Sequence, residues 1–318
     1  MVIPPFTWPV VRPRVVVSRC LLGEAVRYDG GHRASEAAAA LAAVFEVVPA
    51  CPEAEAGLGV PRPPVQRVAG DGGVRVRGVE DPALDVTAAL EAFGAGFVQR
   101  QAPVHGMVGK ARSPSCAAGD SPLFDGAGQV LEEGAGVFAA ALRRAWPGLP
   151  VVDEAGLARA PALFAGQVAV FAHWQSLGGT AAPREARLQF HAAHRLRLLA
   201  HDEAALCRAG RLLFTDPAAY IESVMQALAR PPGAAGHERA LARARRHLAP
   251  GLPGSRLQAL DEALAAWREG GISLDAVRRR LRGLAAEAGE ADLAGASYLR
   301  PHPAEAGLSP APAGCAGR

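Results

Sequence analysis

Residues 14–20 read RVVVSRC, in which a short β-branched apolar run at 14–18 is followed two residues later by a cysteine. A run of this length and composition is typical of a buried strand. The same order returns twice, because the run 45–49 precedes Cys51 and the run 104–108 precedes Cys116. Alanine-rich stretches of helical character separate the runs. The alternation predicts an α/β fold for this half, with a mostly parallel, Rossmann-like sheet covered by helices.

The other elements of this half follow from the spacing of apolar residues. Val86, Leu90, Phe93 and Phe97 recur at helical spacing. Valine alternates with arginine over residues 74–79, which indicates an exposed ribbon at a sheet edge. The predicted helices are 34–43, 85–99 and 136–146, and a fourth strand of the main sheet is 149–152.

The second half of the chain shows only helical patterns, separated by proline- and glycine-rich breaks at 231–233 and 250–254. We therefore expect an α/β domain at 10–158, an all-α domain at 161–307 and a flexible tail at 308–318. The predicted helices of the second half are 163–176, 184–201, 203–213, 217–229, 237–247, 256–268 and 274–288.

Composition excludes several classes of protein. The chain has 318 residues, of which 50% are hydrophobic, and a formal net charge of +3, so it is too apolar and too evenly charged to be disordered. No stretch reaches the roughly 20 apolar residues that span a bilayer. Residues 1–9 carry three prolines and no basic residue, unlike a signal peptide. We expect a cytoplasmic protein with no membrane contact, and the sequence leaves its oligomeric state open.

The net charge divides unevenly along the chain. Residues 1–160 carry 15 basic and 17 acidic side chains, a charge of −2, whereas residues 161–318 carry 19 and 14, a charge of +5. This asymmetry favours an anionic partner for the helical half, although a solvated arginine surface explains it as well. Lys110 is the single lysine among the 34 basic residues.

The three cysteines of the first half each follow a predicted strand. The carboxyl ends of parallel strands share one edge, where ligands bind in open α/β sheets, so Cys20, Cys51 and Cys116 are expected to lie near one another. Their thiolates suit an iron–sulfur cluster with one iron left open, or zinc with His32 or His105 as a fourth ligand. Packing in the core remains a third interpretation.

Two further cysteines have different surroundings. Cys207 lies within a predicted helix, where packing is the simplest interpretation. Cys315 lies in the predicted tail, where a fixed ligand is not expected.

At these motifs the sequence resembles a known family. The stretches that carry the resemblance are CLLGEAVRYDGGH (20–32), VPACPE (48–53), GLGVPR (57–62) and KARSPSC (110–116). They are similar, in order, to the thiouracil desulfurase (TudS-like) family. The stretch FHAAHR (190–195), His201 and the stretch YLRPHP (298–303) resemble the YbgA-type helical domain, a combination similar to RudS-like fused proteins.

The resemblance implies a [4Fe-4S] cluster held by Cys20, Cys51 and Cys116, and no organic cofactor. It further implies that the open iron binds the sulfur of a thiolated pyrimidine, so that C=S becomes C=O by hydrolysis and sulfide is released. The implied substrate is 4-thiouridine in transfer RNA. Desulfuration of free thiouracil and a non-catalytic iron–sulfur module that binds RNA are the alternatives.

The same motifs supply candidate site residues. Glu53 is the candidate acid/base, and Ser113 and Lys110 join it as candidate catalytic residues. Alternatives stay open, because a glutamate at a helix start and a Ser-Pro turn are common structural features. The candidate substrate-binding residues are Arg27, Asp29, His32, Arg112 and Ser115.

In the helical half, one predicted helix carries histidines three residues apart beside several arginines. Arginine suits phosphate and can stack on bases, so this face is a candidate RNA contact. A metal pair and histidines packed between helices are the alternatives. The candidate residues are Arg187, His191, His194 and Arg195.

Overall fold

The computed structural model describes residues 6–70 and 72–308, which form two compact units. The α/β unit comprises Val11–Ala172 together with residues 307–308, and the helical unit comprises His173–Ala306 together with residues 6–10. The predicted fold class, an α/β region followed by a helical region, is confirmed. Of the predicted tail at 308–318, all but Leu308 lies outside the described residues, as does Cys315.

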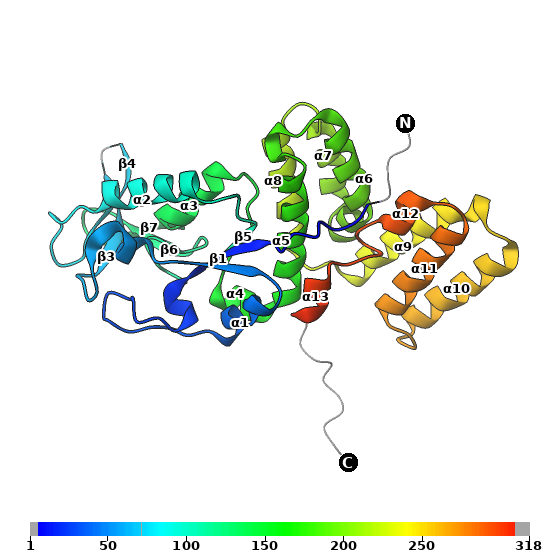
Figure 1. Cartoon of the computed structure of the whole chain (residues 1–318), viewed down its shortest axis with the longest axis horizontal. Helices are drawn as coiled ribbons and strands as arrows, with labels where there is room; N and C mark the ends of the chain where they lie inside the picture. Colours follow the sequence, from blue (N-terminus) through cyan, green and yellow to red (C-terminus); the bar gives the residue numbers. More distant parts are fainter. Residues whose placement is uncertain (1–5, 71, 309–318) are drawn as a thin grey trace, which may run out of the picture. The chain divides into compact units, whose positions relative to one another are not determined.

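A parallel sheet forms the centre of the α/β unit (Figure 1). Its strand order is β2-β1-β5-β8, and every neighbouring pair is parallel. Val15, Val16 and Val17 of the central strand β1 are fully buried, which explains the uninterrupted apolar run in the sequence. The strands are β1 (Arg14–Ser18), β2 (Glu46–Ala50), β5 (Gly106–Gly109) and β8 (Val151–Asp153).

Helices connect these strands, as parallel pairing requires. The predicted apolar spacing is that of α2, where the Phe97 ring packs edge-to-face on the Phe138 ring of α3 at 5.1 Å between centroids. Gly94 of α2 lies so close to Ala141 of α3 that a Cβ on the glycine would sit 3.1 Å from the alanine Cβ. The helices are α1 (Glu36–Ala40), continued by the turn η2 (Leu41–Ala43), α2 (Thr87–Arg100), α3 (Val137–Ala145) and α4 (Glu154–Arg159).

A second, mixed sheet has the order β4-β3-β6-β7, in which only β3 and β6 pair in parallel. The predicted ribbon corresponds to β4 and lies at the edge of this sheet, as expected. Strands β3 and β7 escaped prediction because polar residues such as Arg67 and Glu132 interrupt their apolar pattern, and β6 escaped it because it is four residues long and contains a proline. The strands are β3 (Val65–Gly70), β4 (Gly73–Gly78), β6 (Ser121–Phe124) and β7 (Val130–Gly134).

Helix α5 (Pro161–Ser176) starts in the α/β unit and ends in the helical unit. The helix predicted at 163–176 is therefore α5 and belongs to the α/β unit as far as Ala172, whereas the six later predicted helices lie in the helical unit, and α6 has the predicted bounds. No described helix is long and apolar enough to cross a membrane. The further helices are α6 (Arg184–His201), α7 (Glu203–Leu212), α8 (Pro217–Leu228), α9 (Ala234–Leu248), α10 (Gly254–Arg268), α11 (Leu274–Glu287), α12 (Ala291–Gly295) and α13 (Pro303–Gly307).

Candidate functional site

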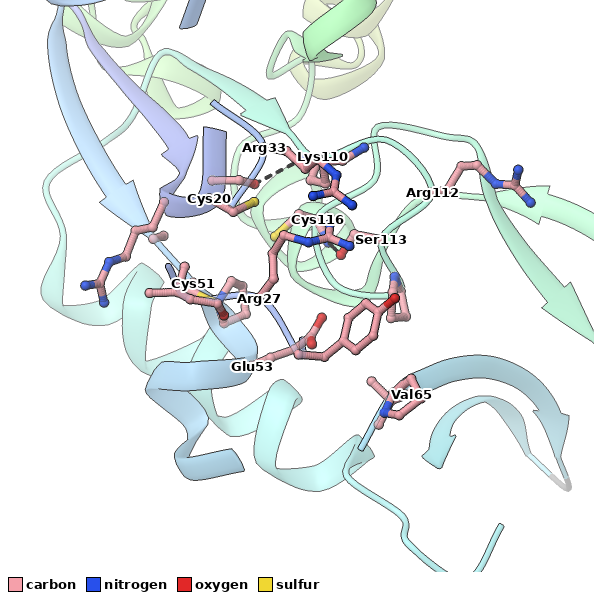
Figure 2. A pocket seen from close by; sticks show the side chains of 18 of the residues that line it. Cys20, Arg27, Arg33, Cys51, Glu53, Val65, Lys110, Arg112, Ser113 and Cys116 are labelled. Atoms are coloured by element: carbon pink, nitrogen blue, oxygen red, sulfur yellow. Dashed lines mark hydrogen bonds between the residues drawn. The ribbon is translucent and has the colours of Figure 1, made fainter. Parts of the chain in front are cut away.

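Three loops at the carboxyl edge of the parallel sheet bring three cysteines together. Cys20 lies two residues after β1, Cys51 directly after β2 and Cys116 in the loop after β5. Because β2, β1 and β5 are neighbours, the three side chains line one cavity of about 410 Å³. We call it the cysteine cavity (Figure 2).

Short turns hold the first two cysteines. Cys20 lies in the turn η1 (Arg19–Leu22), which Gly23 ends with a left-handed φ of 90°. The carbonyl of Cys20 accepts a hydrogen bond from the Arg33 amide at 2.9 Å. The Cys51 amide donates to Oε1 of Glu55 at 2.8 Å, a side-chain cap on the helical turn that follows β2.

Two glycines let the Cys116 loop pack against the sheet and against α3. A Cβ on Gly109 would overlap the carbonyl oxygen of Cys116, and a Cβ on Gly136 would overlap the backbone of Ser115 and Cys116. The Ser115 carbonyl accepts the Phe138 amide at 2.9 Å, so the loop also satisfies amides of the first turn of α3. Backbone contacts therefore fix the position of Cys116.

Burial favours the neutral form of all three thiols. Desolvation, followed by the nearby Cys51, raises the pKa of Cys20 to about 11, although Arg27 and Lys110 act in the opposite direction. Burial likewise raises the pKa of Cys51 and, further, that of Cys116. A metal centre that binds these side chains as thiolates must therefore displace protons.

The lining of the cysteine cavity is rich in basic side chains. It includes six basic side chains and a single acidic one, Glu53. In the described part of the chain, the guanidinium groups of two of the six, Arg33 and Arg112, form no ion pair with a carboxylate. In Figure 2 the Arg112 side chain points away from the cysteines, whereas Arg27 reaches toward Cys116. The paired cations are Arg19 with Glu24, Arg27 with Asp29, Arg62 with Glu53, and Lys110 with Glu154.

Glu53 is held at both carboxylate oxygens. Arg62 donates to Oε2 of Glu53 from Nε at 3.0 Å and from Nη2 at 2.9 Å. The Ser115 hydroxyl donates to Oε1 at 2.9 Å. The Glu53 side chain is 13% exposed and that of Arg62 only 4%. A carboxylate with a fixed orientation and a buried counter-charge thus faces the cavity beside the thiols.

Two other predicted catalytic residues also line the cavity. The Lys110 ammonium bonds to Oε1 of Glu154 at 2.5 Å and to the Ala111 carbonyl at 3.1 Å. The Ser113 hydroxyl accepts hydrogen bonds from the amides of Ser115, at 3.2 Å, and Cys116, at 3.1 Å. Both residues therefore support the loop that carries Cys116.

Three predicted substrate-binding residues lie outside the cavity lining. Asp29 accepts the Gly31 amide at 3.0 Å, a local turn contact. His32 is exposed, and its Nδ1 faces the Ala34 amide at 3.3 Å. Ser115 is fully buried and acts on the site through Glu53. Arg27 and Arg112 do line the cavity.

Neither histidine considered as a zinc ligand lines the cavity. His105 accepts the Arg14 amide at Nδ1 at 2.8 Å, and burial lowers its pKa to about 4. Within the described residues, no three His, Cys, Asp or Glu side chains converge tightly enough to hold one metal ion. An iron–sulfur cluster needs less convergence, because each thiolate binds its own iron.

The four candidate RNA-contact residues of the helical unit differ in how far they are buried. His194 is fully buried between Nδ1 of His173, at 2.9 Å, and Oγ of Ser297, at 2.8 Å, so it is not on an accessible face. His191 and Arg187 are partly buried, and Arg195 is exposed. The packing alternative therefore describes His194 better than an RNA contact does.

The assignment of Cys207 to packing is wrong. In α7 the residues that face inward are Ala205 and Ala209, one helical turn apart, and Cys207 between them is exposed. The sequence reasoning also missed Arg62, Tyr28 and Arg33 as lining residues. Arg62 and Tyr28 stand within the quoted motifs, which was the available signal.

Comparison with known proteins identifies families for both halves. Residues 15–154 match the 2-thiouracil desulfurase family, and residues 195–303 match a family of unknown function, DUF1722. The uncharacterized protein YbbK of Bacillus subtilis (strain 168) is 32% identical over 151 residues, which cover 44% of this chain and 95% of YbbK. A solved structure of the [4Fe-4S]-dependent thiouracil desulfidase TudS is 33% identical, with 46% of this chain and 95% of that chain covered and a TM-score of 0.38. The family matches confirm the resemblance of both halves.

Proposed function

The chain belongs to the 2-thiouracil desulfurase family through residues 15–154, and on that premise we propose that its α/β unit is an iron–sulfur desulfidase of thiolated pyrimidines. The observation that carries the proposal is the cysteine cavity, where three thiols from neighbouring strand ends meet beside a fixed carboxylate. Such a cavity at the carboxyl edge of a parallel sheet is where α/β proteins bind ligands.

The cavity fits a [4Fe-4S] cluster with Cys20, Cys51 and Cys116 as its ligands. Three soft thiolates suit iron, and the cationic lining suits a centre that carries negative charge once its thiolates bind. When bound, such a cluster supplies one iron without a protein ligand, a Lewis acid for the substrate sulfur. We assign no other cofactor, and we place the enzyme in the cytoplasm.

Glu53 is the residue that we assign to proton handling. In the net reaction, the oxygen of one water molecule replaces sulfur on the pyrimidine carbon, and its two hydrogens leave with sulfide as H₂S, without redox change. Glu53 can hold the attacking water and accept its proton, because its carboxylate faces the cavity. Arg62 and Ser115 are positioning residues that fix the Glu53 orientation.

The remaining candidates have supporting roles in the proposal. Lys110 places positive charge near Cys20 and opposes the rise of its pKa. Ser113 orders the loop of Cys116 and offers its hydroxyl to the cavity. Arg27 and Arg112 contribute to the binding of the polar edges of the substrate.

For the substrate, we propose 4-thiouridine in transfer RNA, presented by the helical domain at 161–307. The charge of +5 in residues 161–318 supports an anionic partner. The family description, which names 2-thiouracil, favours the second candidate, the free base.

Sulfide release from three substrates decides between these functions. Anaerobically purified protein is given 2-thiouracil, 4-thiouridine or thiolated tRNA, and sulfide is measured over time. The tRNA proposal expects the fastest release from tRNA, with a rate that falls steeply as salt increases. Turnover of 2-thiouracil alone supports the salvage function, and release from none of the three contradicts a desulfidase.

A further inference from the structure

An exposed aromatic ring lies at the cysteine cavity. Tyr28 lines the cavity although 42% of its surface is exposed. Large apolar side chains are usually covered, and an aromatic ring left open inside a polar, cationic cavity is a surface on which a planar ligand can stack. Tyr28 has no place in the proposed proton handling or among the thiol ligands.

The loop that carries Tyr28 is held in a tight turn. The Arg27 amide donates to the Gly31 carbonyl at 3.1 Å, and the Gly30 amide donates to the Arg27 carbonyl at 3.0 Å. Gly30 has a left-handed φ of 74°, which suits glycine at this position. Tyr28 is thus presented from an ordered turn.

Arg62 connects this turn to the reactive side of the cavity. Its amide donates to the Tyr28 carbonyl at 2.9 Å, and its Nη1 donates to the Val26 carbonyl at 3.0 Å. The same Val26 carbonyl lies 3.7 Å from Sγ of Cys51, and the Arg62 guanidinium holds Glu53. The backbone of Tyr28 therefore keeps a fixed relation to a cluster ligand and to the proposed proton acceptor.

We propose that Tyr28 is the base-binding residue of the cavity and that its ring stacks on the pyrimidine ring of the substrate. The inference rests on the proposed function for the class of substrate. Stacking on tyrosine is tolerant of the exact base, so it supplies affinity while the thiols and Glu53 act on the thiocarbonyl group. Arg27, whose guanidinium lies 5.2 Å from the ring centroid, adds positive charge beside the same ring.

Leucine and phenylalanine substitutions separate stacking from other roles of Tyr28. Tyr28→Leu keeps an apolar side chain without an aromatic face, and Tyr28→Phe keeps the face without the hydroxyl. For the Leu variant we expect KM for the thiolated substrate that the wild type turns over fastest to rise about tenfold or more, with kcat and iron content little changed. The Phe variant should stay within about twofold of wild type, because stacking does not use the hydroxyl.

Phe214 provides a matched control. It is also 42% exposed, the Arg184 guanidinium lies 4.5 Å from its ring centroid, and it does not line the cysteine cavity. Phe214→Leu should leave KM unchanged. An equal increase in both Leu variants would show that Tyr28 only packs beside an arginine.

Calorimetric titration with uracil measures binding apart from turnover, because uracil has no sulfur to lose. Cluster-loaded wild type should bind uracil about tenfold or more tighter than Tyr28→Leu. Equal affinities, or no binding of uracil by the wild type, would overturn the stacking role. A wild type that binds uracil through Tyr28 but releases no sulfide would instead leave this inference standing and remove the proposed function.

Discussion

The α/β unit and the helical unit both bury ionisable side chains, but they use burial differently. Cys20 and Cys116 are 9% and 6% exposed and line a cavity. His173 and His194 are 6% and 0% exposed and hydrogen-bond to each other between helices. Loops at the edge of a parallel sheet leave room for a ligand, whereas packed helices fill that room with side chains. Burial alone therefore does not mark a functional site.

Of the substitutions considered in the two units, removal of a cavity thiol should have the largest effect on sulfide release. Cys20→Ser, Cys51→Ser and Cys116→Ser should each abolish measurable sulfide release, because each removes a proposed cluster ligand. Cys207→Ser is the matched control, since this cysteine is exposed on α7. Release assays on anaerobically purified variants measure the effect, and full activity in the Cys51 variant would show that this thiol is not a cluster ligand.

Glu53→Gln should have the next largest effect and should separate chemistry from cluster binding. Loss of the proton acceptor is expected to lower kcat by about 10² to 10⁴, with iron content unchanged. Glu91→Gln, on an exposed carboxylate of α2 that does not line the cysteine cavity, should have no effect. Loss of iron in Glu53→Gln would instead assign this residue to the support of the cluster.

In the helical unit, substitution of a buried histidine should change stability and leave chemistry intact. His194→Ala strips His173 and Ser297 of their partner, which should lower the free energy of unfolding by about 2–4 kcal/mol. His247→Ala, at an exposed ion pair with Glu290, should change it by less than about 0.5 kcal/mol. Urea titrations measure both, and a loss of 2-thiouracil turnover in folded His194→Ala would place chemistry in the helical unit.

A fall in pH from 7.5 to 6.5 should have the smallest of the expected effects, a modest decrease in the free energy of unfolding. Burial lowers the pKa values of His173, His201 and His237 to about 4, below the unfolded value near 6.5. The unfolded chain therefore binds protons first as pH falls, and stability is lost between pH 6.5 and about 4. From pH 7.5 to 6.5, the three sites together should cost about 1 kcal/mol. Urea unfolding at the two pH values checks the sign, and higher stability at pH 6.5 would contradict it.

The sequence predicted elements best where a single pattern determined them. The bounds of β1 and α6 agree with the prediction, because buried valines and helical spacing are continuous there. Strand β3 was missed because Arg67 stands among its apolar residues. The alternation of valine with arginine was sufficient to predict that β4 lies at the edge of its sheet.

The sequence predicted the part of the site that follows from sheet topology, but it did not predict the part that depends on tertiary contacts. That cysteines after strands share an edge follows from topology, and the structure gives them one cavity. The contact of Arg62 with Glu53 depends on how the chain returns from Gly57 to Arg62, which periodicity does not encode. The exposure of Tyr28 likewise depends on tertiary packing.

We propose that the cysteine cavity holds one iron–sulfur cluster on three cysteines. The most direct measurement is the iron, zinc and acid-labile sulfide content of anaerobically purified wild type and Cys116→Ser. We expect about four irons and four sulfides per wild-type chain, little zinc, and loss of the cluster in the variant. Stoichiometric zinc without labile sulfide in the wild type, or an unchanged cluster content in Cys116→Ser, would contradict it.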